Sequence, residues 1–168
     1  MELIAAIDSR VSAGRLGHPG PTPQQLDLIL HAAARAPDHG KLRPWRLTVL
    51  EGAAREAFTR AAAAAKRVRL GDMSEAQISF ECEKMNRSPA LVVIGCAVNR
   101  ENKKIPEIEQ VVAVGAAVEN AFLAAHDLGF GVMWKTGAAA YDEKVKALLG
   151  LRADDHIVAI LHIGTRVK

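Results

Sequence analysis

The stretch IEQVVAVGAAVENAFLAAHDLGFGVMWKTG, residues 108–137, holds the longest helical pattern of the chain and the strand that follows it. Apolar residues run almost all the way round the helix predicted over 108–129, which is typical of a central, buried helix. Gly129 and Gly131 favour its end. Residues 132–138 then predict a short strand that leads into a loop.

Outward from this stretch, helices and strands are mixed without strict alternation. The pattern predicts strands over 45–52, 90–98 and 156–164, and the two later ones are apolar enough to be buried. Helices are predicted over 2–13, 23–36, 53–68, 74–86 and 141–149. Because two helices come first and two more separate the first two strands, an α+β layered domain fits better than a doubly wound sheet.

Length and composition indicate one globular domain over residues 1–168. The chain is 49% hydrophobic, has a net charge of +3 with scattered cations, and is 4% aromatic, a balance that does not suggest a nucleic-acid partner. It has no continuous apolar run of about 18 residues and no signal-peptide pattern at its start, so we expect no membrane partner. Cys82 and Cys96 form no CxxC motif, which favours a reduced, cytoplasmic compartment.

The segment SRVSAGR, residues 9–15, combines cations with a hydroxyl group. Arg10 and Arg15 supply forked guanidinium groups and Ser12 a hydroxyl donor, which together suit a phosphate. The alternative is a helix C-terminus whose cations complement the helix dipole.

The segment ARAPDHGKLRPWRLTVL, residues 34–50, runs from a helix through Pro37 into a strand. His39 and Arg43 are candidates to donate to the carbonyl groups of a planar ligand, with Trp45 packed beneath it. The alternative is a solvated loop in which Trp45 fills part of the core, and no role is assigned to Asp38, Lys41 or Arg46.

The end of the opening stretch, GFGVMWKTG at 129–137, offers a flat face, a cation and a hydroxyl in Trp134, Lys135 and Thr136. Its glycines permit close approach of the backbone to a ligand. A glycine-terminated helix that enters a strand is the alternative, and the basic end GTRVK at 164–168 is typical of a frayed tail.

Familiar catalytic motifs are missing from the chain. It contains no GxSxG, no HExxH, no Walker motif and no GxGxxG after a strand. The histidines have no metal-ligand spacing, which disfavours a metal hydrolase and predicts no metal site. His156 and His162 flank or lie within a buried strand, and we interpret them as structural.

Taken in order, four segments resemble the nitroreductase family of FMN-dependent oxidoreductases, and most closely its small, YdjA-like members. RVSAGRL at 10–16 is similar to the family's RRSxxR phosphate motif. A second family pattern, RAPxxxxxQPWxFxVx, is similar to RAPDHGKLRPWRLTVL at 35–50. A third pattern, AAxxxGxGxxWxxG, is similar to AAHDLGFGVMWKTG at 124–137. The terminal pattern, xxxGxP, is similar to LHIGT at 161–165.

The resemblance implies a mixed, mainly antiparallel sheet packed between helices, in an interlocked homodimer with FMN at the subunit interface. It also implies an enzyme that passes a hydride from NADH or NADPH through flavin N5 to nitroaromatic, quinone-like or other small oxidants. No catalytic side chain is expected, because the flavin supplies the chemistry. A flavin-binding protein with different FMN chemistry and no true nitroreductase role is the alternative.

Site residues follow from the resemblance position by position. Those implied for FMN are Arg10, Val11, Ser12, Arg35, His39, Trp134, Lys135 and Thr136, with Arg35 reaching the FMN of the other subunit. Those implied for NAD(P) are Ala124, Ala125, His126, Asp127, Leu128 and Gly129. Arg43 and Arg166 are secondary candidates, since Arg43 stands where the family has Gln and Arg166 where it has Pro. Val11 likewise replaces the second arginine of the phosphate motif.

Overall fold

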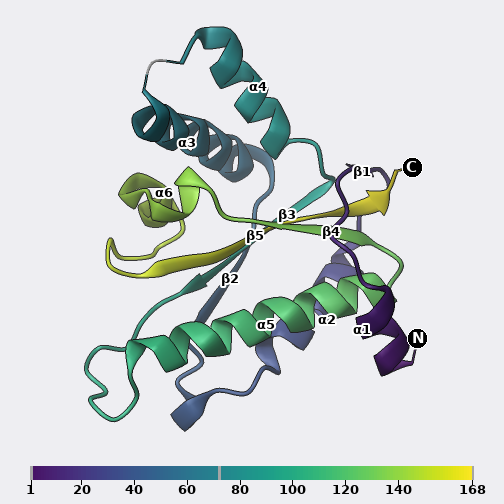
Figure 1. Cartoon of the computed structure of the whole chain (residues 1–168), viewed down its shortest axis with the longest axis vertical. Helices are drawn as coiled ribbons and strands as arrows, with labels where there is room; N and C mark the ends of the chain where they lie inside the picture. The colour runs from purple at the N-terminus through teal and green to yellow at the C-terminus, as the bar shows by residue number, and fades with distance from the viewer. Residues whose placement is uncertain (1, 72, 168) are drawn as a thin grey trace.

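The computed structural model describes residues 2–71 and 73–167, which form a five-stranded antiparallel sheet with helices on both faces (Figure 1). The strands are β1 (Leu16–Gly17), β2 (Trp45–Val49), β3 (Ala90–Cys96), β4 (Gly131–Lys135) and β5 (His156–Arg166). They follow the order β1-β5-β3-β2, and β4 also pairs with β5. In that pairing Met133 lies opposite His162 and Trp134 opposite Leu161. The predicted α+β class and mainly antiparallel sheet are confirmed.

The helices form two layers, one on each side of the sheet (Figure 1). One layer contains α2 (Pro23–Ala34) and α5 (Glu107–Asp127), with α1 (Leu3–Ser9) beside the end of α5. The other contains α3 (Gly52–Leu70), α4 (Glu75–Met85) and α6 (Glu143–Leu148). Two short 3₁₀ turns, η1 (His39–Lys41) and η2 (Ala138–Tyr141), complete the described elements.

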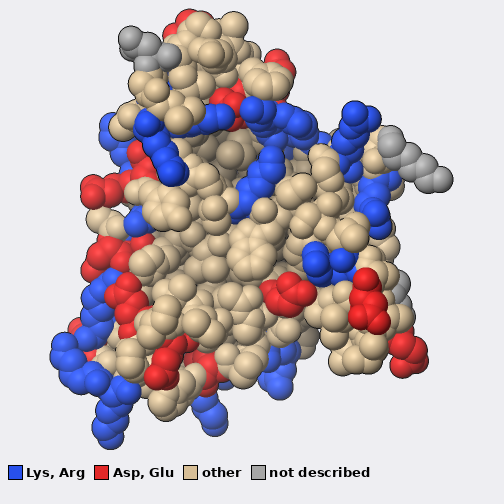
Figure 2. All heavy atoms as spheres, in the orientation of Figure 1, with Lys and Arg blue, Asp and Glu red and all other residues tan. Residues whose placement is uncertain are grey.

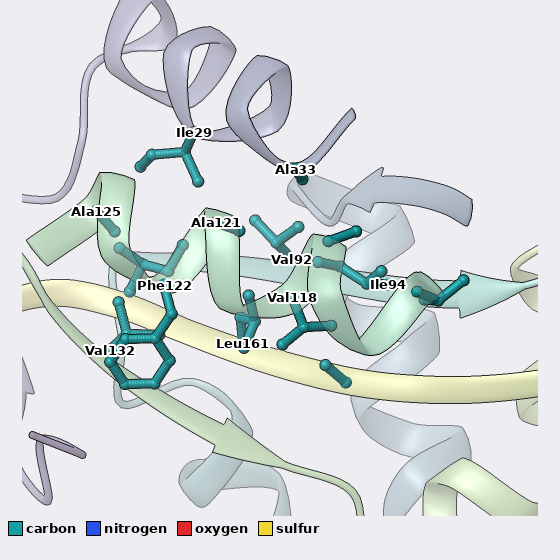
Figure 3. Close-up of a cluster of buried hydrophobic side chains, with 14 of the residues drawn as sticks. Ile29, Ala33, Val92, Ile94, Val118, Ala121, Phe122, Ala125, Val132 and Leu161 are labelled. Atoms are coloured by element: carbon teal, nitrogen blue, oxygen red, sulfur yellow. The ribbon is translucent and has the colours of Figure 1, made fainter. Parts of the chain in front are cut away.

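Two apolar clusters hold the layers to the sheet. Figure 3 shows Val118 and Phe122 of α5 packed beside Val92, Ile94 and Leu161 of the strands, with Ile29 of α2 close by. On the opposite face Leu91 and Val93 of β3 pack with Phe58 of α3 and Val145 of α6. Successive residues of β3 therefore point to opposite faces, as in a strand buried on both sides.

Local sequence signals fix the ends of several helices. Thr22 and Ser74 each form a capping box with the glutamine three residues later, and Pro23 occupies the first helical position of α2. Gly129 follows α5 with φ of 88°, a left-handed conformation that favours glycine. The predicted stop after residues 108–129 is thus confirmed within two residues.

The first predicted helix is too long. It was expected over 2–13, but α1 ends at Ser9 and Arg10 is extended, with ψ of 129°. Residues beyond it join the sheet instead, because Ser12 forms a bridge with Val132 and the Ala13 N–H donates to the Val132 carbonyl at 2.8 Å. Arg10 is the C-cap of α1, with its backbone N–H donating to the Ala6 carbonyl, and the residues that follow it pair with the sheet.

The expectation that α5 is buried on nearly all sides also needs correction. Val114, Ala117 and Val118 are buried, whereas Ile108 and Val112 are 65% and 62% exposed. By length and composition alone, α5 is the one described helix that could cross a membrane, a property it shares with core helices of soluble proteins. Here its buried face packs on the sheet and its other face is left uncovered by this chain.

Candidate functional site

A cleft of about 500 Å³ lies between the α3–α4 pair and the part of the sheet where β4 pairs with β5. Five charged side chains line it together with a buried histidine: Lys66 and Arg69 of α3, Glu81 and Lys84 of α4, Lys135 of β4, and His162 of β5. A smaller hollow adjoins it and shares Lys84, Lys135 and His162. Ala13 and Gly14 line that smaller hollow, so the segment after α1 reaches the hollow beside the cleft.

The cleft is electropositive. Figure 2 shows Lys and Arg side chains gathered around the hollow below the α3–α4 layer. Glu81 offsets part of this charge, with its Oε1 at 2.7 Å from Lys66 Nζ and 2.5 Å from Lys84 Nζ. Although burial disfavours its ionisation, the hydrogen bonds from these two lysines hold the pKa of Glu81 below its usual value. One carboxylate against four lining cations leaves the cleft suited to an anionic ligand.

His162 forms part of the wall of this cleft and is only 4% exposed. Its Nδ1 lies 3.0 Å from Ser88 Oγ, and the Ser88 hydroxyl donates to the Ala90 carbonyl at 2.9 Å. Within the described residues, His162 Nε2 is buried without a hydrogen-bond partner. Burial, together with the nearby charges of Lys135, Arg55 and Arg87, lowers the pKa of His162 to about 4. The imidazole is therefore neutral at physiological pH.

Two of the sequence-predicted flavin residues line the cleft. Lys135 and Thr136 both contribute to its wall, and Gly137 follows them with φ of 71°. Trp134 lies on the opposite face of β4, because side chains alternate along a strand. Its indole N–H donates to the Val158 carbonyl at 3.0 Å.

The predicted phosphate residues lie beside the end of α5. The Arg10 guanidinium is 4.8 Å from the centre of the Phe122 ring, and its Nε is 3.8 Å from Glu119 Oε1. Ser12 is bridged to β4, and Val11 is 47% exposed. Arg10 is thus placed by packing against α5, while the backbone of Ser12 is fixed to the strand that carries Lys135.

The predicted dinucleotide segment, residues 124–129, forms the end of α5 and the turn after it. His126 Nε2 lies 2.9 Å from Ser9 Oγ, which joins this end of α5 to α1. Ala125 is fully buried, so its side chain faces the core and not a ligand. Asp127 and Gly129 are exposed.

The remaining predicted residues lie at the other end of α5. His39 Nδ1 is 2.6 Å from Glu109 Oε2, in the first turn of that helix. Glu109 and His126 are roughly 25 Å apart along the helix, at a rise of about 1.5 Å per residue. One chain therefore does not bring His39 to the cleft lined by Lys135.

The loop around His39 has an unusual backbone. Gly40, Lys41 and Arg43 all have positive φ, at 72°, 54° and 47°. Asp38, to which no role was assigned, accepts a hydrogen bond from the Arg43 N–H at 2.6 Å and so holds this loop together. Arg46, also unassigned, donates to the Trp45 carbonyl at 3.0 Å.

Sequence reasoning missed the side chains contributed by α3 and α4 and the position of His162 in the cleft wall. Lys66 and Arg69 stand at i, i+3 in an alanine-rich helix, and Lys84 follows Glu81 at the same spacing. These patterns are common on solvated helices. Only the packing of α3 and α4 over the sheet edge brings them together. Among the described residues, no group of three His, Cys, Asp or Glu side chains could hold a metal ion.

Comparison with known proteins identifies the class of protein that has this fold. The model of the nitroreductase family matches residues 9–165, and the chain belongs to that family. The chain is 36% identical over 168 residues to the protein named "Putative NAD(P)H nitroreductase YdjA" of Escherichia coli K12, covering 98% of this chain and 88% of that one. It is 30% identical over 168 residues to the protein named "Putative NAD(P)H nitroreductase" of Haemophilus influenzae, covering 100% of this chain and 90% of that one.

Solved structures share the fold. A nitroreductase-like protein of Bacillus cereus matches with a TM-score of 0.82 at 24% identity, over 100% of this chain and 87% of the other. The structure named as a "putative nitroreductase in complex with fmn" from Desulfovibrio desulfuricans matches with a TM-score of 0.77 at 23% identity, over 100% of this chain and 88% of the other.

Proposed function

We propose that this chain is an FMN-dependent NAD(P)H oxidoreductase of the nitroreductase type. Family membership supports this, as do the names of the relatives that share about a third of its residues. The observation that carries the proposal is the cleft of about 500 Å³, whose wall combines cations with one neutral hydrogen-bond acceptor. FMN is an anion that presents both carbonyl acceptors and an N–H donor on one planar ring.

The residues around the cleft fit FMN in charge and in hydrogen-bonding type. Lys135 and Thr136 supply a cation and a hydroxyl at the cleft wall, and Lys84 supplies a second cation. Arg10, Val11 and Ser12 would hold the phosphate end, with Arg166 at the end of β5 as a further cation. Bound FMN would accept a hydride from NADH or NADPH and pass it to a small oxidant such as a nitroaromatic or a quinone.

The chain's own contribution to this chemistry is position and charge. A lysine ammonium near the flavin carbonyls stabilises negative charge that develops on reduction, and it acts more strongly where water is partly excluded. Of the four cations that line the cleft, Lys135 and Lys84 also line the smaller hollow with His162, whereas Arg35 and Arg43 are not among the residues that line either hollow. We therefore assign the charge stabilisation to the two lysines.

The working unit in this proposal is a homodimer. Besides Ile108 and Val112 on the uncovered face of α5, the neighbouring helices α1 and α2 expose the apolar side chains of Leu3, Ile4, Ile7 and Leu28. Apolar surface of this extent is typical of a permanent subunit interface. A partner chain would cover it and bring its own Arg35 and His39 to the cleft of the first subunit.

The other predicted positions follow from this arrangement. NADH or NADPH would approach from the end of α5, at residues 124–129, where Asp127 and Gly129 are exposed. Trp134, on the opposite face of β4 from the cleft, would contact the partner or the ribityl side of the flavin. We propose one domain over residues 1–168, and a cytoplasmic location because hydride donors and reduced thiols are maintained there.

Absorbance and kinetics test this function together. Purified protein is expected to be yellow, or to take up added FMN, and to oxidise NADH or NADPH with a nitroaromatic or quinone acceptor. Flavin uptake without turnover of any such acceptor would favour the alternative flavin-binding protein. Absence of flavin uptake would reject the proposal.

A further inference from the structure

We propose that His162 is the residue that recognises the imide N–H of the flavin ring, by accepting its hydrogen bond at Nε2. This inference rests on the proposed function and adds a specificity-determining contact to it. His162 lies in the segment LHIGT at a position that the family pattern xxxGxP leaves open, and Ser88 lies outside all four segments on which the family resemblance rests.

The hydrogen bonds around Ser88 determine which nitrogen of His162 carries the proton. The Ser88 hydroxyl has one hydrogen, and it donates that hydrogen to the Ala90 carbonyl at 2.9 Å. Ser88 Oγ can then only accept from His162 Nδ1, which lies 3.0 Å away. A neutral imidazole protonated at Nδ1 has a bare lone pair at Nε2.

The environment keeps the ring neutral. Cations face it from three directions: Lys135 from β4, Arg55 and Lys66 from α3, and Lys84 and Arg87 from α4 and the turn after it. Glu81 is the carboxylate at this cleft, and its Oε1 is shared by Lys66 and Lys84. Protonation of His162 would add a buried charge among cations, and its pKa of about 4 reflects this.

A buried lone pair without a partner identifies the ligand group that belongs there. Leaving such an acceptor unsatisfied costs free energy, so a ligand that donates to it gains affinity and selectivity. Nε2 is buried without a partner among the described residues, and the His162 side chain lines both hollows together with Lys84 and Lys135. These two long, flexible side chains would move aside to admit the donor.

The pattern of donors and acceptors at this wall matches one edge of the flavin. Oxidised FMN has a single ring N–H, and a carbonyl flanks it on each side. An acceptor at His162 with ammonium groups at Lys84 and Lys135 is complementary to that edge. The phosphate of FMN bears only acceptors at neutral pH and would not satisfy Nε2.

A flavin analogue methylated at the imide nitrogen tests this contact in the unmodified protein. We would measure dissociation constants of FMN and of N3-methyl FMN by quenching of flavin fluorescence at pH 7.5. The analogue is expected to bind at least tenfold more weakly than FMN. Equal affinities for the two flavins would overturn the proposal, and this arm requires no variant to fold.

Two substitutions at His162 separate the hydrogen bond from the shape of the site. His162→Gln retains an acceptor, because an amide oxygen can occupy the place of Nε2, and the preference for FMN should persist. His162→Leu removes the acceptor, so FMN affinity should fall and the preference over the analogue should shrink below about threefold. An unchanged preference in His162→Leu would overturn the proposal.

A second histidine on the same strand provides the matched control. His156 lies at the start of β5, with its Nε2 2.5 Å from Glu107 Oε1, outside the cleft. His156→Leu should leave both dissociation constants within twofold of the parent values. If the protein binds neither flavin, the proposed function itself fails; if it binds FMN and N3-methyl FMN equally, only the role of His162 fails.

Discussion

Arg10 lies where α1 ends and the chain turns to the sheet edge. Its guanidinium packs on Phe122, and its ion pair with Glu119 is loose, at 3.8 Å. Packing of the side chain keeps the group ordered while its donors stay available to a phosphate.

We expect Arg10→Ala to weaken FMN binding by about 1.5–3 kcal/mol, or roughly 10- to 150-fold, as for loss of a charge-assisted hydrogen bond. Fluorescence titration measures this directly. Arg60→Ala is the control, because Arg60 is an exposed arginine of α3 that pairs with Glu56, at 3.7 Å, away from the cleft lining. Equal FMN affinities of Arg10→Ala and Arg60→Ala would show that Arg10 does not bind the phosphate.

Asp155 anchors the turn before β5 and is 2% exposed. It accepts hydrogen bonds from the Val98 and Arg152 backbone N–H groups, both at 2.9 Å, and ion-pairs with Arg152 and Arg100. Although burial opposes ionisation, the hydrogen bonds from Arg152 and Val98 lower the pKa of Asp155 to about 2. The folded state therefore favours the ionised carboxylate.

We expect Asp155→Asn to lower the free energy of unfolding at pH 7 by about 2 kcal/mol, the equivalent of this pKa change. Because the folded pKa is depressed, the stabilisation is present above the unfolded pKa near 4 and is lost as the pH falls towards 2. The difference in free energy of unfolding between the parent protein and Asp155→Asn, measured by urea unfolding, should therefore become smaller as the pH falls from about 4 towards 2. Asp154→Asn, at a more exposed neighbour, should cost less than about 0.5 kcal/mol.

At the scale of single elements, α4 stands out because none of its described residues is buried. Its capping box at Ser74 and the contacts of Glu81 with Lys66 and Lys84 hold it over the cleft. A helix with so little buried surface opens more readily than the rest of the fold.

Ser74→Ala removes the cap and should destabilise α4 by about 1 kcal/mol. Amide hydrogen exchange should accelerate across α4, while global unfolding in urea changes little. Thr22→Ala removes the corresponding cap of α2, which buries Leu26, Ile29 and Ala33, and should instead lower global stability by a similar amount. The same exchange rates in α4 before and after Ser74→Ala would contradict this view of the helix.

The elements themselves were largely predictable from the sequence, because their signals are local. Thr22 with Pro23, and Gly129 after α5, mark boundaries through backbone preferences that no tertiary contact overrides. The end of α1 was not predictable, because Ser12 leaves the helix to pair with Val132, a residue far along the chain. The exposed face of α5 escaped prediction for a related reason, since composition does not say which apolar residues one chain can cover.

At the scale of the whole molecule, the candidate residues divide into two groups at opposite ends of α5. Lys135 and Thr136 line the cleft, and Arg10 and Ser12 lie beside the end of α5 and β4, whereas His39 is bound to Glu109 at the start of the helix. The sequence motifs could be recognised without the structure. The distance in space between the two groups of residues in one chain could not be predicted, because it depends on how α5 crosses the sheet. A homodimer would bring the two groups of residues together if each cleft is completed by Arg35 and His39 of the partner chain.

Subunit mixing tests this central claim most directly. Arg10→Ala damages the phosphate side of a cleft, and the double variant Arg35→Ala, His39→Ala damages the proposed partner side. Each homodimer alone should bind little FMN. Unfolding and refolding the two variants together should restore tight FMN binding to about a quarter of the sites, because each mixed dimer has one cleft with both sides intact. No recovery from refolded, dimeric mixtures would show that both groups act within one chain, and would contradict the account.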